Sequence, residues 1–146
     1  CAFRRDAAWY SMFLLRKIWY LEWNHGEIIK LYDISCAIHN GQSEISEPFG
    51  DTWKHIALEN KPTKWHIGRI IYFINHPEEI RDIEIDNVSY DGYIFPAPTI
   101  IDGNHRFMAA MWLHDQNKMY KVHCRYGGRL DVLDYLKGEI DECPVE

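Results

Sequence analysis

Apolar residues recur every three to four positions near the start of the chain, with charged residues between them. This spacing is close to the period of an α-helix and predicts an amphipathic helix over residues 7–23, within a helical segment at 1–25. The tripeptide Asn-His-Gly that follows is a helix-ending signal. The apolar positions that set the period are Trp9, Phe13, Ile18 and Leu21.

The next part of the chain changes period twice. Residues 27–34 alternate apolar and polar side chains, which predicts a strand. Residues 39–52 have no period and are rich in turn-forming residues, so we expect a loop of the length often found in lids and binding loops. Helical spacing returns over residues 61–77, where Pro77 ends the helix. Its expected apolar face consists of Trp65, Ile67, Ile70, Ile71 and Ile74.

The second half of the chain predicts strands separated by short helices. Residues 80–102 contain two strands joined at Ser-Tyr-Asp-Gly-Tyr, in which Asp-Gly is a hairpin signal. A helix at 107–113, a strand at 119–126 and a short helix at 129–138 follow. This mixed order predicts an α+β fold, a small mixed sheet with flanking helices. At 146 residues without a linker or repeat, we expect one domain over 1–146.

Composition narrows the partners. The formal net charge is −6, which disfavours non-specific binding to nucleic-acid phosphates because such binding needs a basic surface. The four cysteines form no C-x-x-C pair, so we expect reduced thiols and a cytoplasmic protein rather than a zinc or redox centre. The apolar run at residues 7–15 is too short to span a bilayer, and we expect no membrane partner.

The candidate site is the corner at Asp102, Gly103, Asn104, His105 and Arg106, where the second strand of the hairpin meets a helix. First-turn amides of a helix lack partners within the helix and lie at the positive end of its dipole, which favours an anion. Glycine permits close approach of a ligand, while an imidazole and a guanidinium add donors. We expect Asp102 to cap the helix or to act as base or metal ligand. From the residues alone, an ordinary capped turn explains the corner equally well.

Other polar residues are weaker candidates, each with a simpler structural explanation. Three sets could serve a phosphate site: the first as metal ligands, the second as part of a lid, and the third from an opposite wall. The first two are explained as well by acidic residues at the surface, and the third by an ordinary polar helix face. They are Glu84 and Asp86, then Glu44, Glu47 and Asp51, then His66 and Arg69. A set of cations close to the strand at 119–126 could contact phosphate or nucleic acid. These are Lys121, Arg125 and Arg129.

The stretch Ile-Asp-Gly-Asn-His-Arg-Phe-Met-Ala-Ala resembles the D-G-x-H-R-x-x-A-A motif of the ParB/sulfiredoxin superfamily. The order of elements over residues 65–138 is similar to sulfiredoxin as well. The resemblance implies a ParB/sulfiredoxin-like fold that receives the phosphates of ATP or CTP at the turn. Carried across, the cofactor-binding residues are Gly103, Asn104, His105 and Arg106, with Asp102 and His105 as the catalytic candidates and Asp102 as the candidate ligand of Mg2+.

Departures from the motif limit what the resemblance implies. Asn104 stands where sulfiredoxin has its catalytic cysteine, so sulfinic-acid reduction is not expected. The variant is similar to the ParB-like free-serine kinases and to many ParB-like nuclease-type proteins. We therefore expect a nucleotide-binding enzyme that catalyses hydrolysis or phosphoryl transfer to an unidentified acceptor. The alternatives are a protein-interaction module with a degenerate nucleotide pocket, and a ParB-like DNA nuclease, which the negative charge disfavours.

Overall fold

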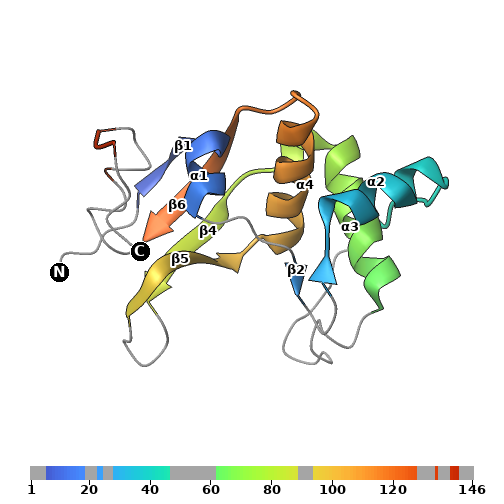
Figure 1. Cartoon of the computed structure of the whole chain (residues 1–146), viewed down its shortest axis with the longest axis horizontal. Helices are drawn as coiled ribbons and strands as arrows, with labels where there is room; N and C mark the ends of the chain where they lie inside the picture. The colour runs from blue at the N-terminus through green and yellow to red at the C-terminus, as the bar shows by residue number, and fades with distance from the viewer. Residues whose placement is uncertain are drawn as a thin grey trace.

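The computed structural model describes residues 6–18, 23–24, 28–46, 62–88, 94–127, 134 and 139–141. Helices and strands are mixed along these residues, which confirms the α+β class (Figure 1). The elements are β1 (Asp6–Ser11), α1 (Met12–Ile18), β2 (Trp23–Asn24), β3 (Ile28–Ile29), α2 (Leu31–His39), α3 (Thr63–Asn75), the 3-10 helix η3 (Pro77–Glu79), β4 (Ile83–Val88), β5 (Ile94–Asp102), α4 (Asn104–Asp115) and β6 (Lys121–Gly127).

Four strands form a mixed sheet in the order β1-β6-β4-β5. The β4 and β5 strands are antiparallel, as the predicted hairpin requires, and β1 is antiparallel to β6. The β6 strand runs parallel to β4, and the chain between them consists of β5, which returns antiparallel to β4, and of helix α4. A separate pair, β2 and β3, is antiparallel. The predicted mixed sheet with flanking helices is thus confirmed.

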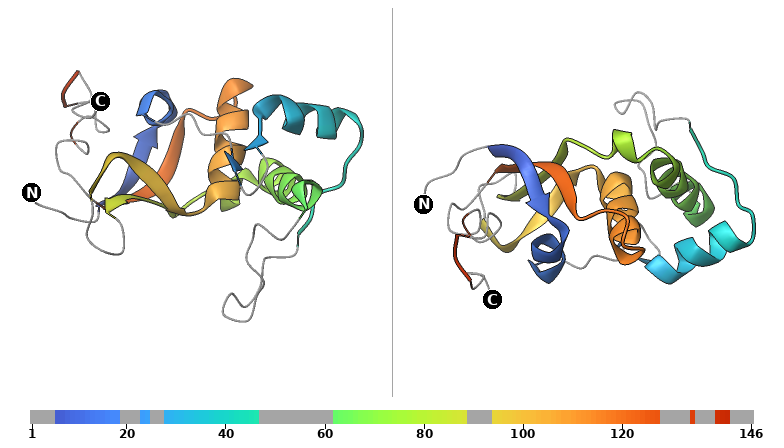
Figure 2. Two further views of the ribbon diagram at one scale, coloured as in Figure 1. Left: turned by 60° about the horizontal axis from the view of Figure 1, so that its bottom comes forward. Right: turned by 90° about the horizontal axis from the view of Figure 1, so that it is seen from above.

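Helix α4 lies between the sheet and the helices α2 and α3 (Figures 1 and 2). Alternation along the strands explains which face is buried: Val122, Cys124 and Tyr126 are fully buried, whereas Arg125 between them is exposed. Ile83 and Ile85 of β4 are buried in the same core. Residues of α4 and α3 complete it, chiefly Phe107, Met108, Met111, Ile67, Ile70 and Ile71.

The helix predicted over residues 7–23 is wrong in its first part. Residues 6–11 are strand β1, paired with β6, and among the described residues of this segment the helix is Met12–Ile18. The side chains of Trp9 and Phe13, expected on the buried face, are 60% and 61% exposed, whereas Tyr10 is buried. The segment also alternates with period two, and pairing with β6 selects that period over the helical one.

The strand predicted over residues 27–34 is also largely wrong. It is limited to Ile28–Ile29, and α2 begins at Leu31. The side chain of Asp33 accepts a hydrogen bond from the Lys30 backbone N–H at 2.9 Å, which satisfies a donor at the start of the helix. Ile34 is the fully buried residue of this helix. The helix start capped by Asp33 therefore takes the place of the strand that the alternating apolar and polar residues predicted.

The other elements follow the sequence closely. Helix α3 ends at Asn75, two residues before Pro77, and residues 40–46 contain no helix or strand. The hairpin turn at 89–93 and all but residue 134 of the predicted helix at 129–138 lie outside the described residues. Cys36 and Cys124 are free thiols. Within the part of the chain that the structure describes, no helix has the length and apolar character needed to cross a membrane.

Candidate functional site at the start of α4

Gly103 makes the turn from β5 into α4. Its backbone has φ +101° and ψ 30°, a conformation that glycine adopts readily and other residues do not. The Gly103 carbonyl accepts a hydrogen bond from the Phe107 N–H at 2.8 Å, which starts the helical ladder. The amides of the first turn, from Asn104 to Arg106, therefore point along the axis toward the end of the helix, where the dipole is positive.

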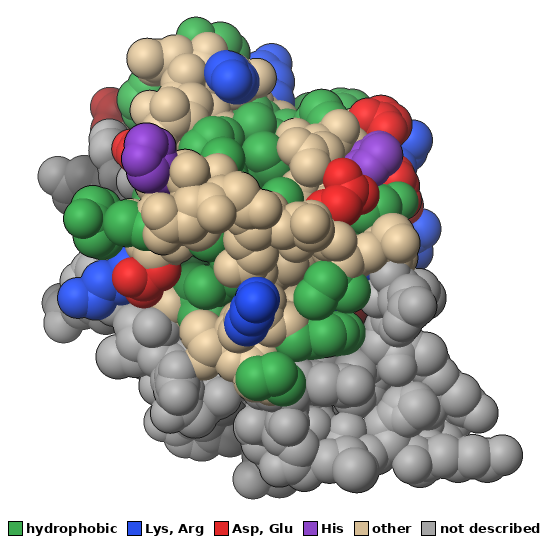
Figure 3. Space-filling model, turned by 90° about the vertical axis from the view of Figure 1, so that its right-hand side faces the viewer, with side chains coloured by type: hydrophobic (Ala, Val, Ile, Leu, Met, Phe, Trp, Pro, Cys, Tyr) green, Lys and Arg blue, Asp and Glu red, His purple; other side chains and the backbone are tan. Residues whose placement is uncertain are grey.

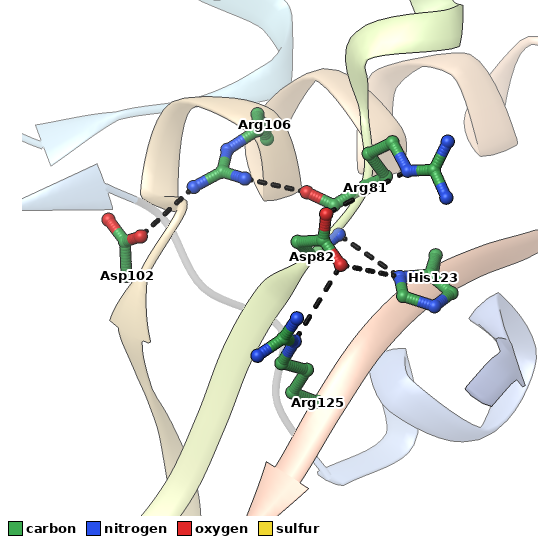
Figure 4. A network of polar contacts seen from close by, with 6 residues as sticks. All are labelled: Arg81, Asp82, Asp102, Arg106, His123 and Arg125. Carbon is green, nitrogen blue, oxygen red and sulfur yellow. Dashed lines mark hydrogen bonds and ion pairs between the residues drawn. The ribbon is translucent and has the colours of Figure 1, made fainter. Parts of the chain in front are cut away.

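The guanidinium of Arg106 folds back over this turn. Its Nη1 donates to the Arg81 carbonyl at 2.6 Å, just before β4, and its Nη2 donates to Asp102 Oδ2 at 3.2 Å (Figure 4). A β-carbon on Gly103 would lie only 3.1–3.3 Å from three guanidinium atoms. Glycine is therefore required here by its backbone angles and by the close approach of Arg106.

Asp102 does not cap the helix as expected. The N-cap position is taken by Gly103, without a side-chain hydrogen bond, and the Asp102 carboxylate accepts from Arg106 instead. Its side chain is 67% exposed at the end of β5. The Asp102 carboxylate thus lies on the solvent-exposed side of the corner.

His105 turns toward helix α3. Its Nε2 lies 3.0 Å from Nδ1 of His66, and the two rings stack at 5.2 Å between centroids with 18° between their planes. The ring of Trp65 meets both imidazoles edge-on, at 5.2 Å from His66 and 5.6 Å from His105. Because these residues belong to the first turns of α3 and α4, the two helices begin side by side.

His105 and Arg106 thus contact different neighbours. His105 lies against α3, and Arg106 reaches the chain before β4. The structure thus gives the two basic side chains different partners within the molecule. What lies between them is the end of α4 itself, so a guest at that end would have the imidazole pair on one flank and the guanidinium on another.

The sequence weighed His66 and Arg69 as one opposite wall, and the structure separates them. His66 lies at the corner, whereas Nη1 of Arg69 donates to the Ile45 carbonyl at 2.9 Å. The Arg69 guanidinium packs over the rings of Tyr72 and Phe73, at 5.1 and 4.9 Å from their centroids. Desolvation by burial lowers the pKa of Arg69 from its ordinary value. Arg69 therefore ties the segment at residues 40–46 to α3.

A cleft of about 730 Å³ is lined by Trp65 at the start of α3, and none of residues 102–106 contributes to its wall. It lies between the segment at residues 40–45 and the start of α3, and Gln42, Ser43 and Lys64 contribute polar groups to its wall. Sequence reasoning missed Trp65 and Lys64 as site residues. Both stand in the first turn of α3, so the argument applied to the start of α4 could have found them.

One other candidate carboxylate, that of Glu84, belongs to a residue beside this corner. Glu84 is opposite Asp102 in the β4–β5 register and is partly buried. Glu44 accepts from Asn75, and this hydrogen bond lowers its pKa, with His76 adding to the effect. Glu47 and Asp51 lie outside the described residues, as does the side chain of Asp86.

One group of three potential metal ligands occurs within the described residues, at the C-terminal end of α3. It consists of His76, Glu78 and Glu79, whose ligand atoms lie within 4.8 Å of one another. Figure 3, a view onto the side of α2 and α3, shows acidic side chains next to a histidine on this face of the molecule. The group begins ten residues after His66, so it lies about 15 Å along the helix axis from the corner. Asp102 is not part of it.

Two side chains of β6, those of His123 and Arg125, lie against Asp82, which precedes β4. Nδ1 of His123 lies 3.2 Å from Asp82 Oδ1, and Nε of Arg125 lies 3.7 Å from the same oxygen (Figure 4). Asp82 has a positive φ of 56°, uncommon outside glycine but tolerated by aspartate. The structure thus pairs Arg125 within the molecule, while Lys121 is exposed and Arg129 lies outside the described residues.

The geometry therefore brings Gly103, Asn104, His105, Arg106 and Asp102 to one corner and adds His66 from α3. Burial raises the pKa of the nearby Cys124 thiol to about 12, so this cysteine offers no thiolate at neutral pH.

Comparison of the chain with family models, curated proteins and solved structures gives no match.

Proposed function

We propose that this chain binds a nucleoside triphosphate, ATP or CTP, with the phosphates at the start of α4. The observation that carries the proposal is the His66–His105 contact, which sets the N-termini of α3 and α4 side by side. Two dipoles with their positive ends together favour an anion more strongly than one. The ParB/sulfiredoxin-like motif at the same turn agrees with this assignment.

Arg106 can contribute without leaving its present partners. A guanidinium has five N–H donors, and the contacts with Arg81 and Asp102 use two of them. Its side chain is 21% exposed, so an anion at the helix end can reach the remaining donors. Lys64 adds a second cation from the start of α3, and it has no ion-pair partner among the described residues.

With a triphosphate bound, we propose hydrolysis or phosphoryl transfer with Mg2+. Magnesium in such sites takes one or two carboxylates and fills its remaining positions with phosphate oxygens and water, and the single exposed carboxylate of Asp102 fits this mode. The ion would offset charge on the phosphates. Asp102 is also the candidate base for the attacking water or acceptor hydroxyl, and His105 the candidate donor to a phosphate oxygen.

Calorimetric titration with ATP and with CTP, each with and without Mg2+, tests the proposal. We expect Arg106→Ala and His105→Ala to weaken binding by about tenfold or more, because each removes a donor to an anion. Lys118→Ala is the matched control: it removes one positive charge beyond the other end of α4 and should leave affinity unchanged. A phosphate-release assay then measures turnover.

Absence of heat with both nucleotides would overturn the proposal and favour the protein-interaction module. Equal losses of affinity in Arg106→Ala and Lys118→Ala would show that general charge, not the corner, binds the ligand. Incubation with supercoiled plasmid and Mg2+ tests the nuclease alternative, which the net charge of −6 disfavours.

A further inference from the structure

The imidazole of His66 is buried to 1% exposure yet lies in hydrogen-bonding contact with a residue of the candidate site. It comes from α3, its Nδ1 lies 3.0 Å from Nε2 of His105, and the rings are stacked. The edge of Trp65 packs on both rings and restrains their rotation. A side chain this deeply buried cannot itself meet a ligand of the size of a nucleotide, so any role it has at the site is exerted through His105.

The contact also constrains where the protons sit. Two ring nitrogens at 3.0 Å share a single proton, so one is the donor and the other the acceptor. In a neutral imidazole the hydrogen bond made by one nitrogen decides which nitrogen carries the proton. If His66 donates from Nδ1, then Nε2 of His105 is the acceptor and the proton of His105 must be on Nδ1.

We infer that His66 is a positioning residue for His105: by donating to Nε2 it fixes the ring and keeps the His105 proton on Nδ1. The inference rests on the proposed function, because that function decides between the two proton arrangements. An imidazole at the positive end of α4 that serves an anion has to act as a donor there, and Nδ1–H provides this without a net charge on the ring.

Nitrogen NMR of the full chain tests the inference without nucleotide. Long-range correlation spectra of 15N-labelled protein, with His105 assigned by its loss in His105→Ala, should show the proton on Nδ1. His66→Phe keeps an aromatic ring and removes the hydrogen bond, so the proton should shift toward Nε2. His66→Asn retains an N–H near the position of Nδ1 and should restore the wild-type pattern. His39→Phe, on an exposed histidine of α2, is the matched control and should change nothing.

Nucleotide affinity supplies the second measurement. We expect Kd to rise about tenfold in His66→Phe and to stay within about twofold of wild type in His66→Asn. A wild-type spectrum with the His105 proton on Nε2 would overturn the inference, and so would an unchanged His105 signal in a folded His66→Phe. Because the wild-type spectrum is recorded without ligand, it decides the inference even if His66→Phe does not fold. A protein that shows the expected tautomer and binds no nucleotide would refute the proposed function alone.

Discussion

The substitution Gly103→Ala adds a single carbon atom, the β-carbon, at the corner. With φ at +101°, any side chain at this position strains the backbone by about 1–2 kcal/mol. The new β-carbon would also lie 3.1–3.3 Å from the Arg106 guanidinium, so that group has to move. Moving it weakens the 2.6 Å bond to the Arg81 carbonyl, worth about 1–2 kcal/mol for a charged donor that is partly exposed. We expect a total loss of roughly 2–4 kcal/mol, with little from the exposed Asp102 contact.

Urea unfolding followed by tryptophan fluorescence measures this loss. Gly41→Ala is the matched control, because Gly41 also has a positive φ, +79°, but a β-carbon there would meet nothing within 4 Å. It should cost only the backbone strain, so Gly103→Ala should be less stable than Gly41→Ala by about 1–2 kcal/mol. In the background of Arg106→Ala this difference should vanish. Equal losses for the two glycines, or the same Gly103→Ala loss with and without Arg106, would refute the reasoning.

The remaining predictions concern other parts of the structure. Gly68→Ala should lower the melting temperature although alanine favours helices, because its β-carbon would lie 2.6 Å from Cδ1 of Ile45; Ile45→Ala in the same chain should recover part of the loss, and no recovery would argue against that clash. Iodoacetamide at pH 8, read out by peptide mass spectrometry, should label Cys36 well before Cys124, whose pKa is about 12; comparable rates would contradict its burial. The folded protein holds the pKa of Glu44 below its ordinary value of 4.5, so this carboxylate adds to the free energy of unfolding above pH 4.5, and the gain is lost as the pH falls through the lowered pKa. Glu44→Gln should therefore weaken the dependence of stability on pH in acid. The same dependence in both proteins would count against this contact.

The features that were predicted best are those that depend on residues close together in the sequence. Helix α3 was predictable because its apolar positions repeat with one period and Pro77 limits it. The corner was predictable because glycine between a strand and a helix signals a positive φ. Strand β1 was not, because the same residues satisfy a helical and an alternating pattern, and only the partner strand β6 decides between them.

The contacts that define the candidate site were mostly beyond the reach of local patterns. His66 and His105 are 39 positions apart, and only the packing of α3 against α4 brings their rings together. The partner of Arg106 is a backbone carbonyl at Arg81, which no side-chain pattern encodes. The motif therefore located the corner, but the direction of its two basic side chains depended on tertiary packing.

The central position of β6 has a consequence for how the chain reaches its native state. Strand β1 pairs only with β6 in the described sheet, so it leaves the ribosome well before its partner strand. During synthesis, residues 6–11 therefore have no native partner until residues 121–127 have emerged. The closing of this long-range ladder should be slow relative to formation of the β4–β5 hairpin, and an emerging chain exposes an unpaired aromatic strand that chaperones can bind.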